Sequence, residues 1–137
     1  ELSPGSGVCV EVDVDFGDAR LERRARWDGV AEDFRRRIAG ARTFGFEREI
    51  PDLVRRGLAS HVGPESVVVI CADRILSAGP EFMSDEPARH KLLDLVGDIY
   101  VHGGPFEGHV RARRPGHAAT HEALQSALDA GAIALTK

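Results

Sequence analysis

The feature that most constrains the fold is a run of strict alternation near the start of the chain. Four valines and four other residues take turns there: Val8, Val10, Val12 and Val14 against Cys9, Glu11, Asp13 and Asp15. An apolar, β-branched side chain at every second position is typical of a strand that buries one face. Such a strand needs a second layer over its apolar face. The chain is therefore expected to build a sheet covered by other elements.

The rest of the pattern supplies those elements. In the first half of the chain, we expect strands over 7–16 and 21–27, a helix over 30–41 capped by Asp28, an exposed loop over 41–50 and a short helix over 51–58. Strands over 67–71 and 74–76 and a loop over 77–83 should follow. The last part should contain a helix from Ser84 or Asp85 to Val101, a strand over 106–113 and a helix from His117 to Leu128. This order predicts an α+β fold, a two-layer sandwich in which a mixed or antiparallel sheet packs against helices. With 137 residues, we expect a single domain over 1–137.

Composition narrows the class of protein. The formal net charge of -4 gives no sign of nucleic-acid binding, and no apolar run approaches a membrane span. Cys9 and Cys71 lie in apolar stretches and are expected to be buried free thiols, which points to the cytoplasm. The start has no secretory pattern, and its first residue is Glu1 rather than Met, so we expect a processed product or a piece of a longer chain.

Two groups of residues carry the features of a chemical site. His90 and Asp94 lie four apart in the longest expected helix, so both heads project from one face and can share a metal, with Asp98 one turn further on. His117 follows Pro115-Gly116 at a strand-to-helix junction, where a histidine can act as a general acid. Each has a plainer interpretation, because such pairs are more often helix-surface contacts and such histidines are more often caps.

Other polar residues carry no site on spacing alone. Lys91 and Thr43 have no obvious structural duty. Four further histidines show no interpretable spacing and are taken as surface residues: His61, His102, His109 and His121. Spacing by itself therefore predicts an α+β domain with a possible metal pair.

Three linked motifs add a resemblance to a known family. Residues 41–46 (ARTFGF), 89–98 (RHKLLDLVGD) and 116–118 (GHA) resemble the second domain of UDP-3-O-acyl-N-acetylglucosamine deacetylase, an enzyme of lipid A biosynthesis. Their order and intervals also match, and the similarity runs from about Gly7 to Leu128. The resemblance implies a zinc-dependent amidohydrolase, of which this chain is the carboxy-terminal half. It also implies a small strand-helix-strand insert in the fold.

The resemblance assigns the catalytic roles. It makes His90 and Asp94 two of three protein ligands of a Zn2+ ion, which lowers the pKa of a bound water and polarises the amide carbonyl. His117 is implied as the general acid for the departing amine, or as a cation that stabilises the oxyanion, with Asp98 orienting it. Thr43 is implied to donate a hydrogen bond to that oxyanion, and Lys91 to add positive charge near it.

The resemblance also assigns contacts to the UDP-linked acylated glucosamine. Phe44 and Phe46 are expected to pack on sugar and nucleotide, Asp15 and Phe16 to touch the nucleotide, and Arg114 to lie near the diphosphate. An apolar passage for the acyl chain is expected to be lined by Ile50, Ala59, Val67 and Val69.

Part of the family's site has no counterpart in this sequence. The third zinc ligand, a His, and the general base, a Glu, are implied to come from an amino-terminal domain, in cis or in trans. Alone, the domain is expected to bind zinc poorly and to turn over little. Four departures from the family pattern put the acyl-chain length and the substrate in doubt: Gly17-Asp18, Glu47, Ser60-His61-Val62-Gly63 and Thr120-His121.

Three hypotheses follow. The first is an enzyme half that works with an amino-terminal domain. The second is a non-catalytic nucleotide-sugar-binding or regulatory module that keeps the fold. The third is a remote α+β domain whose motif match is structural only.

Overall fold

A four-stranded mixed sheet forms the larger layer of the molecule. The computed structural model describes residues 1–57, 66–104 and 106–134. The strands are β1 (Leu2–Ser3), β2 (Val8–Asp13), β3 (Arg24–Trp27) and β7 (Gly108–Arg113), in the order β1-β7-β2-β3. β2 runs parallel to β7, and the other two pairs are antiparallel. The expected α+β class and mixed sheet are confirmed.

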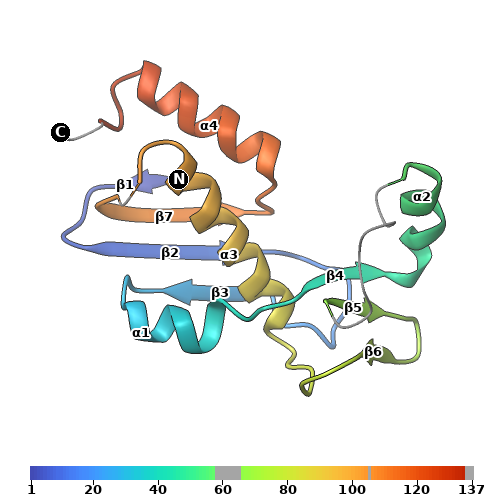
Figure 1. Cartoon of the computed structure of the whole chain (residues 1–137). Helices are drawn as coiled ribbons and strands as arrows, with labels where there is room; N and C mark the ends of the chain where they lie inside the picture. Colours follow the sequence, from blue (N-terminus) through green and yellow to red (C-terminus); the bar gives the residue numbers. More distant parts are fainter. Residues whose placement is uncertain (58–65, 105, 135–137) are drawn as a thin grey trace.

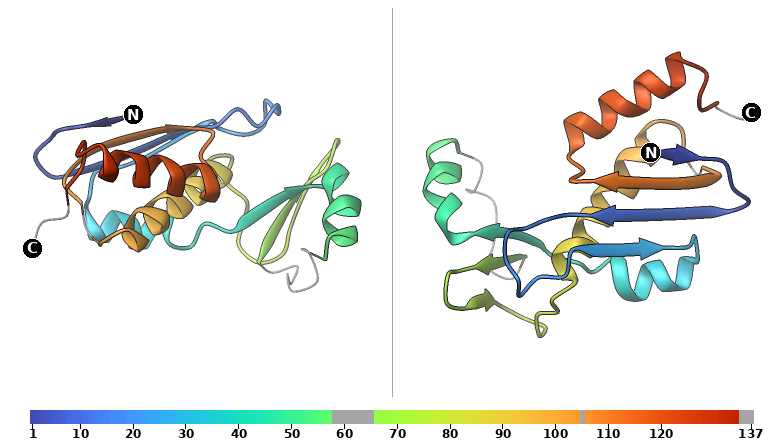
Figure 2. Two further views of the ribbon diagram at one scale, coloured as in Figure 1. Left: turned by 90° about the horizontal axis from the view of Figure 1, so that it is seen from above. Right: turned by 180° about the vertical axis from the view of Figure 1, so that it is seen from behind.

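Helices cover one face of this sheet (Figure 2). They are α1 (Ala31–Asp33), which continues as the π-helical turn η1 (Phe34–Ile38), α3 (Glu86–Val101) and α4 (His117–Asp129). Val10 and Val12 of β2 are almost completely buried and share one core cluster with Leu92 of α3 and Leu124 of α4. The alternation seen in the sequence therefore does what it predicts, since it turns the valines toward the helices.

A smaller unit projects from the side of the sandwich (Figure 1). It contains β4 (Thr43–Phe46), the 3-10 turn η2 (Glu47–Glu49), α2 (Ile50–Arg55), β5 (Val67–Ile70) and β6 (Ile75–Ser77). β4 pairs in parallel with β5, and β6 pairs antiparallel with β5. This unit is the expected strand-helix-strand insert.

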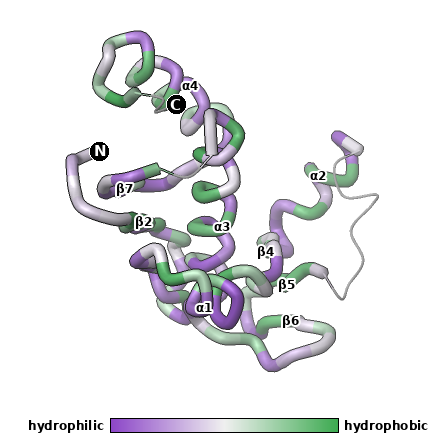
Figure 3. Tube along the Cα trace, turned by 60° about the vertical axis from the view of Figure 1, so that its left-hand side comes forward, coloured by the Kyte–Doolittle hydropathy of each residue, from purple (hydrophilic) through white to green (hydrophobic). Residues whose placement is uncertain are grey.

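In Figure 3 its strand β5 and the strand β2 of the main sheet show green, hydrophobic stretches, whereas the helix labelled α1 is largely purple.

Three sequence predictions need correction. The expected loop over 41–50 is wrong, because Thr43–Phe46 forms β4, whose partner strand β5 lies more than twenty residues further along the chain. Asp28 is not a helix cap: the helix begins at Ala31 after Val30, and the Asp28 carboxylate accepts a hydrogen bond from Arg26 instead. β1 was not expected at all, because two exposed residues carry no alternation and only pairing with β7 makes them a strand.

Both cysteines are buried free thiols, as predicted. Burial raises the pKa of the Cys9 thiol and of the Cys71 thiol, which keeps both in the less reactive neutral form. In the part of the chain that the structure describes, no helix is long and apolar enough to cross a membrane.

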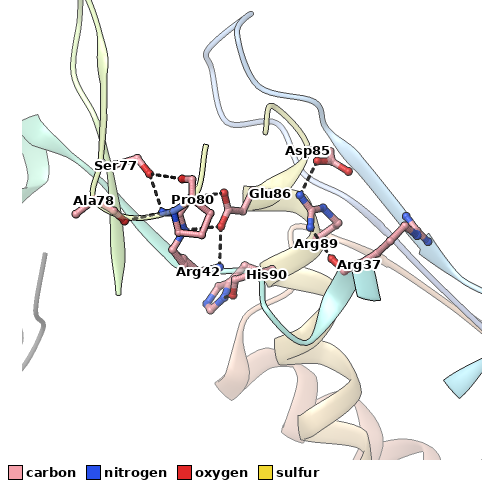
Figure 4. A network of polar contacts seen from close by, with 10 residues as sticks. Arg37, Arg42, Ser77, Ala78, Pro80, Asp85, Glu86, Arg89 and His90 are labelled. Atoms are coloured by element: carbon pink, nitrogen blue, oxygen red, sulfur yellow. Dashed lines mark hydrogen bonds and ion pairs between the residues drawn. The ribbon is translucent and has the colours of Figure 1, made fainter. Parts of the chain in front are cut away.

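A buried ion pair joins the insert to the sandwich, and we call it the Arg42 junction. Arg42 donates from Nε and Nη2 to the two carboxylate oxygens of Glu86 at 2.8 and 2.9 Å, and its backbone N–H donates to the same group at 3.0 Å. The remaining guanidinium nitrogen donates to Ser77 Oγ and to the carbonyl of Ala78 (Figure 4). The two charged side chains are only 11% and 6% exposed. Glu86 opens α3, so the junction ties β4 and β6 to the start of that helix.

The charge of Arg42 outweighs the cost of burying Glu86. Burial acts to raise the pKa of Glu86, but hydrogen bonds and charge from Arg42 hold that pKa below its ordinary value. Next to it, Arg89 donates to Asp85 at 2.9 Å and to the carbonyl of Arg37 (Figure 4). The first turn of α3 is thereby fixed from two sides.

The substitution Glu86→Gln tests the junction. It leaves the buried Arg42 charge without its counter-charge, so we expect a loss of about 3 kcal/mol in the free energy of unfolding, measured with urea. The control is Asp52→Asn, which removes the partner of Arg55 in an exposed pair and should change stability by less than about 0.5 kcal/mol. Equal stabilities for the two variants would contradict a structural role for the pair.

Candidate active site

The candidate site lies along α3, where three of the predicted residues occupy successive turns. His90, Asp94 and Asp98 are spaced by four residues, so their side chains project from adjacent positions on one side of the helix. The face of α3 that carries Leu92 packs on the core instead. The helix can therefore be held by its apolar stripe while it presents polar groups on another side.

The ring of His90 is oriented by the backbone. Its Nδ1 lies 3.0 Å from the carbonyl oxygen of Ala41, the residue before the Arg42 junction. A carbonyl oxygen can only accept, so Nδ1 carries the proton and the Nε2 of the neutral ring keeps a lone pair. This is the arrangement in which histidines usually bind metal ions.

The heads of His90 and Asp94 have a separation that suits a shared metal ion. His90 Nε2 lies 3.5 Å from Asp94 Oδ1, beyond a normal hydrogen bond. Two ligand atoms on one tetrahedral zinc ion stand about 3.4 Å apart, given bonds of about 2.0–2.2 Å. The other Asp94 oxygen lies 3.2 Å from Lys91 Nζ, which balances part of its charge. The donor set therefore fits Zn2+, and the ligand roles of His90 and Asp94 stay predictions.

His117 is held by Asp98. It is the first residue of α4, after Gly116 in an extended conformation, and its Nδ1 lies 2.8 Å from Asp98 Oδ1. The carboxylate is buried, whereas the His117 side chain is 65% exposed. The hydrogen bond and charge of Asp98 raise the pKa of His117, and Asp94 adds to this while Lys91 opposes it. His117 therefore stands on the same side of α3 as the possible metal pair.

An aromatic cluster borders His90. The ring of Phe44 meets those of Phe16, Phe46 and His90 edge-on, at centroid distances of 5.4, 6.3 and 6.4 Å. Lys91 Nζ lies 5.9 Å from the centre of the Phe44 ring. Phe16 and Phe46 belong to the hydrophobic core and are each only 9% exposed, so Phe44 presents the most accessible ring of the three.

The predicted nucleotide residues meet at a surface pocket. Asp15 and Arg114 line it together with Asp13, Arg23 and Arg113. Arg114 adopts a left-handed backbone conformation with φ of 49°, which is uncommon for a residue other than glycine, and its N–H donates to the Asp13 carbonyl at 3.0 Å. The Arg114 backbone is thus fixed by the neighbouring strand β2, and its side chain lines the pocket together with those of Arg23 and Arg113.

The remaining predicted residues lie in the insert. Thr43 begins β4 directly after the Arg42 junction and pairs with Val67. Val67 and Val69 are half-buried on the face of β5 opposite to the core-facing Val68, and Ile50 opens α2. Ala59 and the segment 60–63 lie outside the described residues. The acyl passage is therefore only partly represented, and it stays a prediction.

Comparison with known proteins identifies the family. The family model described as UDP-3-O-acyl N-acetylglycosamine deacetylase matches residues 1–129. The chain belongs to this deacetylase family. A UDP-3-O-acyl-N-acetylglucosamine deacetylase of Sodalis glossinidius (strain morsitans) is 35% identical over 131 residues, which cover 93% of this chain and 43% of the relative. That of Myxococcus xanthus (strain DK1622) is 36% identical over 116 residues, covering 85% and 33%.

The deacetylase relatives are much longer than the part they share with this chain. The relative from Idiomarina loihiensis (strain ATCC BAA-735 / DSM 15497 / L2-TR) is 34% identical, again over 93% of this chain and 43% of its own length. The chain thus spans less than half the length of each of these relatives. Among the residues that the structure describes, no group of three or more His, Cys, Asp or Glu side chains could hold a metal ion.

The sequence analysis did not identify two histidines that lie close to the candidate site. His102 and His121, taken as surface residues, lie with His102 Nε2 2.8 Å from His121 Nδ1. His121 Nε2 also lies 3.5 Å from Asp98 Oδ1. The spacing of His117 and His121 by one helical turn could have indicated a shared partner, but the meeting with His102 depends on how α4 docks on α3. Arg42 and Glu86 were missed for the same kind of reason.

The substitution Asp98→Asn tests the control of His117. Removing the Asp98 charge should lower the His117 pKa toward its ordinary value of about 6.5. The measurement is an NMR titration of the His117 imidazole in metal-free protein. Asp94→Asn is the matched control and should lower it less. Because the pKa of His117 is higher in the folded than in the unfolded state, its protonation adds to the free energy of unfolding. That contribution is complete below the unfolded-state pKa and is lost as the pH rises through the folded-state pKa. An unchanged His117 pKa in Asp98→Asn would refute the pairing.

Proposed function

We propose that this chain is the carboxy-terminal part of a zinc-dependent deacetylase of the cytoplasm. Its reaction is hydrolysis of the acetamide of UDP-3-O-acyl-N-acetylglucosamine, in lipid A biosynthesis. Family membership supports the reaction class. The observation that carries the proposal is the placement of His117 beside a His90–Asp94 pair whose heads have the separation of two metal ligands.

His90 and Asp94 would hold the zinc ion from successive turns of α3. When bound, zinc lowers the pKa of a water molecule and polarises the amide carbonyl. The Ala41 carbonyl keeps the proton of His90 on Nδ1 and so keeps Nε2 available. This hydrogen bond also restricts the orientation of the ring.

His117 is proposed to protonate the departing amine. Asp98 holds its Nδ1, which leaves Nε2 for the substrate, and the raised pKa of His117 favours the charged form of the ring. In the same charged form, His117 also stabilises a nearby oxyanion. Thr43 is proposed to donate its hydroxyl proton to that oxyanion. Lys91 is proposed to add positive charge at the edge of the site.

The substrate is proposed to extend from this centre to both sides. The Phe44 ring, with Phe46 and Phe16 behind it, offers an apolar surface for the sugar. The pocket with Asp15 and Arg114 offers hydrogen bonds and positive charge to the nucleotide diphosphate. Ile50, Val67 and Val69 would line the path of the acyl chain.

The reaction needs groups that the described residues do not provide together. We propose that an amino-terminal domain, in cis or in trans, supplies a third ligand, a His, and the general base, a Glu. A catalytic zinc ion usually has three protein ligands, and His90 and Asp94 would supply two of them. The isolated chain is then inactive or nearly so.

Reconstitution of activity is the direct test. Fusing the chain to the amino-terminal part of the Sodalis glossinidius relative should give zinc-dependent deacetylation of the UDP-sugar, measured by release of acetate. His117→Ala should lower kcat by about 100- to 10,000-fold, the range for general acid catalysis. Asp129→Asn is the control and should leave the rate unchanged, because it removes only the charge of an exposed side chain whose oxygen can still accept the hydrogen bond from Gln125. A folded fusion that binds the UDP-sugar without turnover would favour a non-catalytic module instead.

Zinc binding can be measured separately from turnover. In the fusion, His90→Ala removes one ligand and should weaken Zn2+ binding by more than about 100-fold in calorimetry, beyond the effect of losing an outer partner. His109→Ala, on an exposed position of β7, is the control and should bind zinc as before. If His90→Ala bound zinc as tightly as the parent, His90 would not be a ligand.

A further inference from the structure

Three histidines and one carboxylate meet where α4 packs on α3. Asp98 lies on α3 and His102 follows its last turn, while His117 and His121 occupy successive turns of α4. Figure 1 and Figure 2 show the two helices side by side. The contacts form one continuous chain, from His102 through His121 and Asp98 to His117.

We propose that His121 is a positioning residue for His117. It shares the Asp98 oxygen that holds His117 and so weakens that interaction, while His102, hydrogen-bonded to the other ring nitrogen, reinforces the His121 tautomer that Asp98 favours. This inference rests on the proposed function and extends it. It assigns an influence on the acidity of His117 to His121 and His102, which belong to neither the His90–Asp94 pair nor the proposed acid.

The geometry separates this arrangement from a second metal site. The two ring nitrogens of His102 and His121 are 2.8 Å apart. That distance is usual for a hydrogen bond and shorter than the about 3.3 Å expected for two nitrogens on one tetrahedral zinc ion. One histidine therefore donates a proton to the other.

The direction of that donation follows from Asp98. An ionised carboxylate only accepts, so the tautomer with a proton on His121 Nε2 is favoured and the one with a lone pair there is repelled. Neutral His121 then has an accepting Nδ1, and His102 Nε2 must donate to it. His117 Nδ1 donates to the same carboxylate oxygen. Each of the three rings therefore donates its N–H along this series of contacts in the direction of Asp98.

Sharing one oxygen has a definite effect on His117. His121 Nε2 lies 3.5 Å from Asp98 Oδ1, too far for a strong hydrogen bond, whereas His117 Nδ1 lies 2.8 Å from the same oxygen. His121 therefore interacts electrostatically with the Asp98 carboxylate without replacing His117 as its hydrogen-bond partner. A neutral donor reduces the negative charge available to His117, and a protonated His121 repels the His117 charge. The neutral and the protonated form of His121 both lower the pKa of His117. His117 is therefore a stronger acid than it would be if Asp98 interacted with His117 alone.

Other charged groups around His117 do not reproduce this effect. On α3, Asp94 favours the charged form of His117 and Lys91 opposes it. Of these two, Lys91 is already 3.2 Å from Asp94, so their effects on His117 partly cancel. His121 differs because it acts on the carboxylate that directly holds the acid. The efficiency of a general acid depends on its pKa, and His121 acts on the pKa of His117 through Asp98.

The test is an NMR titration of His117 in the metal-free chain. His121→Ala should raise the His117 pKa by about 0.3–1 unit, because Asp98 then serves His117 alone. His121→Gln keeps a neutral amide donor and should give a smaller rise. His102→Ala should leave His121 with a mixture of tautomers in its imidazole 15N shifts and raise the His117 pKa slightly. The control is His109→Ala on β7, which should change neither quantity.

The outcomes decide the proposal whether or not the reconstituted enzyme is active. A His117 pKa that is unchanged or lower in both folded His121 variants would overturn it. If His121→Ala does not fold, the smaller rise in His121→Gln and the tautomer change in His102→Ala still decide it. In an active fusion, the high-pH limb of kcat should move upward in His121→Ala by the same amount as the NMR pKa, and an unmoved limb would contradict the assigned role.

Discussion

The Arg42 junction is the interaction on which the rest of the candidate site depends. Its guanidinium occupies both oxygens of Glu86 and also reaches Ser77 and Ala78, so three segments of the chain meet at one buried ion pair. The adjacent residue, Ala41, orients His90 through its carbonyl oxygen. Buried pairs of this kind stabilise a fold little compared with an apolar contact, but they are strongly directional. Here the direction sets where β4 starts, and so where Thr43 and Phe44 stand relative to α3.

Asp98 has the corresponding role at the other end of the helix. It fixes His117 at the first turn of α4, while Leu124 on that helix enters the common core. His90 and Asp94 are thus attached to α3 directly, and His117 of α4 is tied to the same helix through Asp98. Such attachment keeps reacting groups within the small tolerances that catalysis demands. It also explains why polar residues on one side of α3 coexist with complete burial of Leu92 on another.

Sequence alone predicts the local parts of this arrangement. The periodicity around Leu92 predicts α3, and the spacing of His90 and Asp94 predicts that their heads meet, because both depend only on helix geometry. The strand Thr43–Phe46 could not be predicted in this way, since its glycine and aromatic residues are paired only through β5. The meeting of His102 with His121 was also out of reach, because it depends on the angle and register at which two helices dock.

The candidate site is held in place by contacts within the chain itself. The proton of His90 is committed to Ala41, Lys91 offsets part of the charge of Asp94, and His117 is held by a buried carboxylate. Side chains that are already fixed lose little further conformational entropy on binding, so an ion or a domain that completes the site gains affinity from the order present here. With His90 and Asp94 as the two proposed ligands, too few for a closed zinc site, assembly with a partner would be favoured over independent metal binding. If the proposed function is right, dividing the catalytic groups between two domains would make zinc capture depend on correct domain pairing.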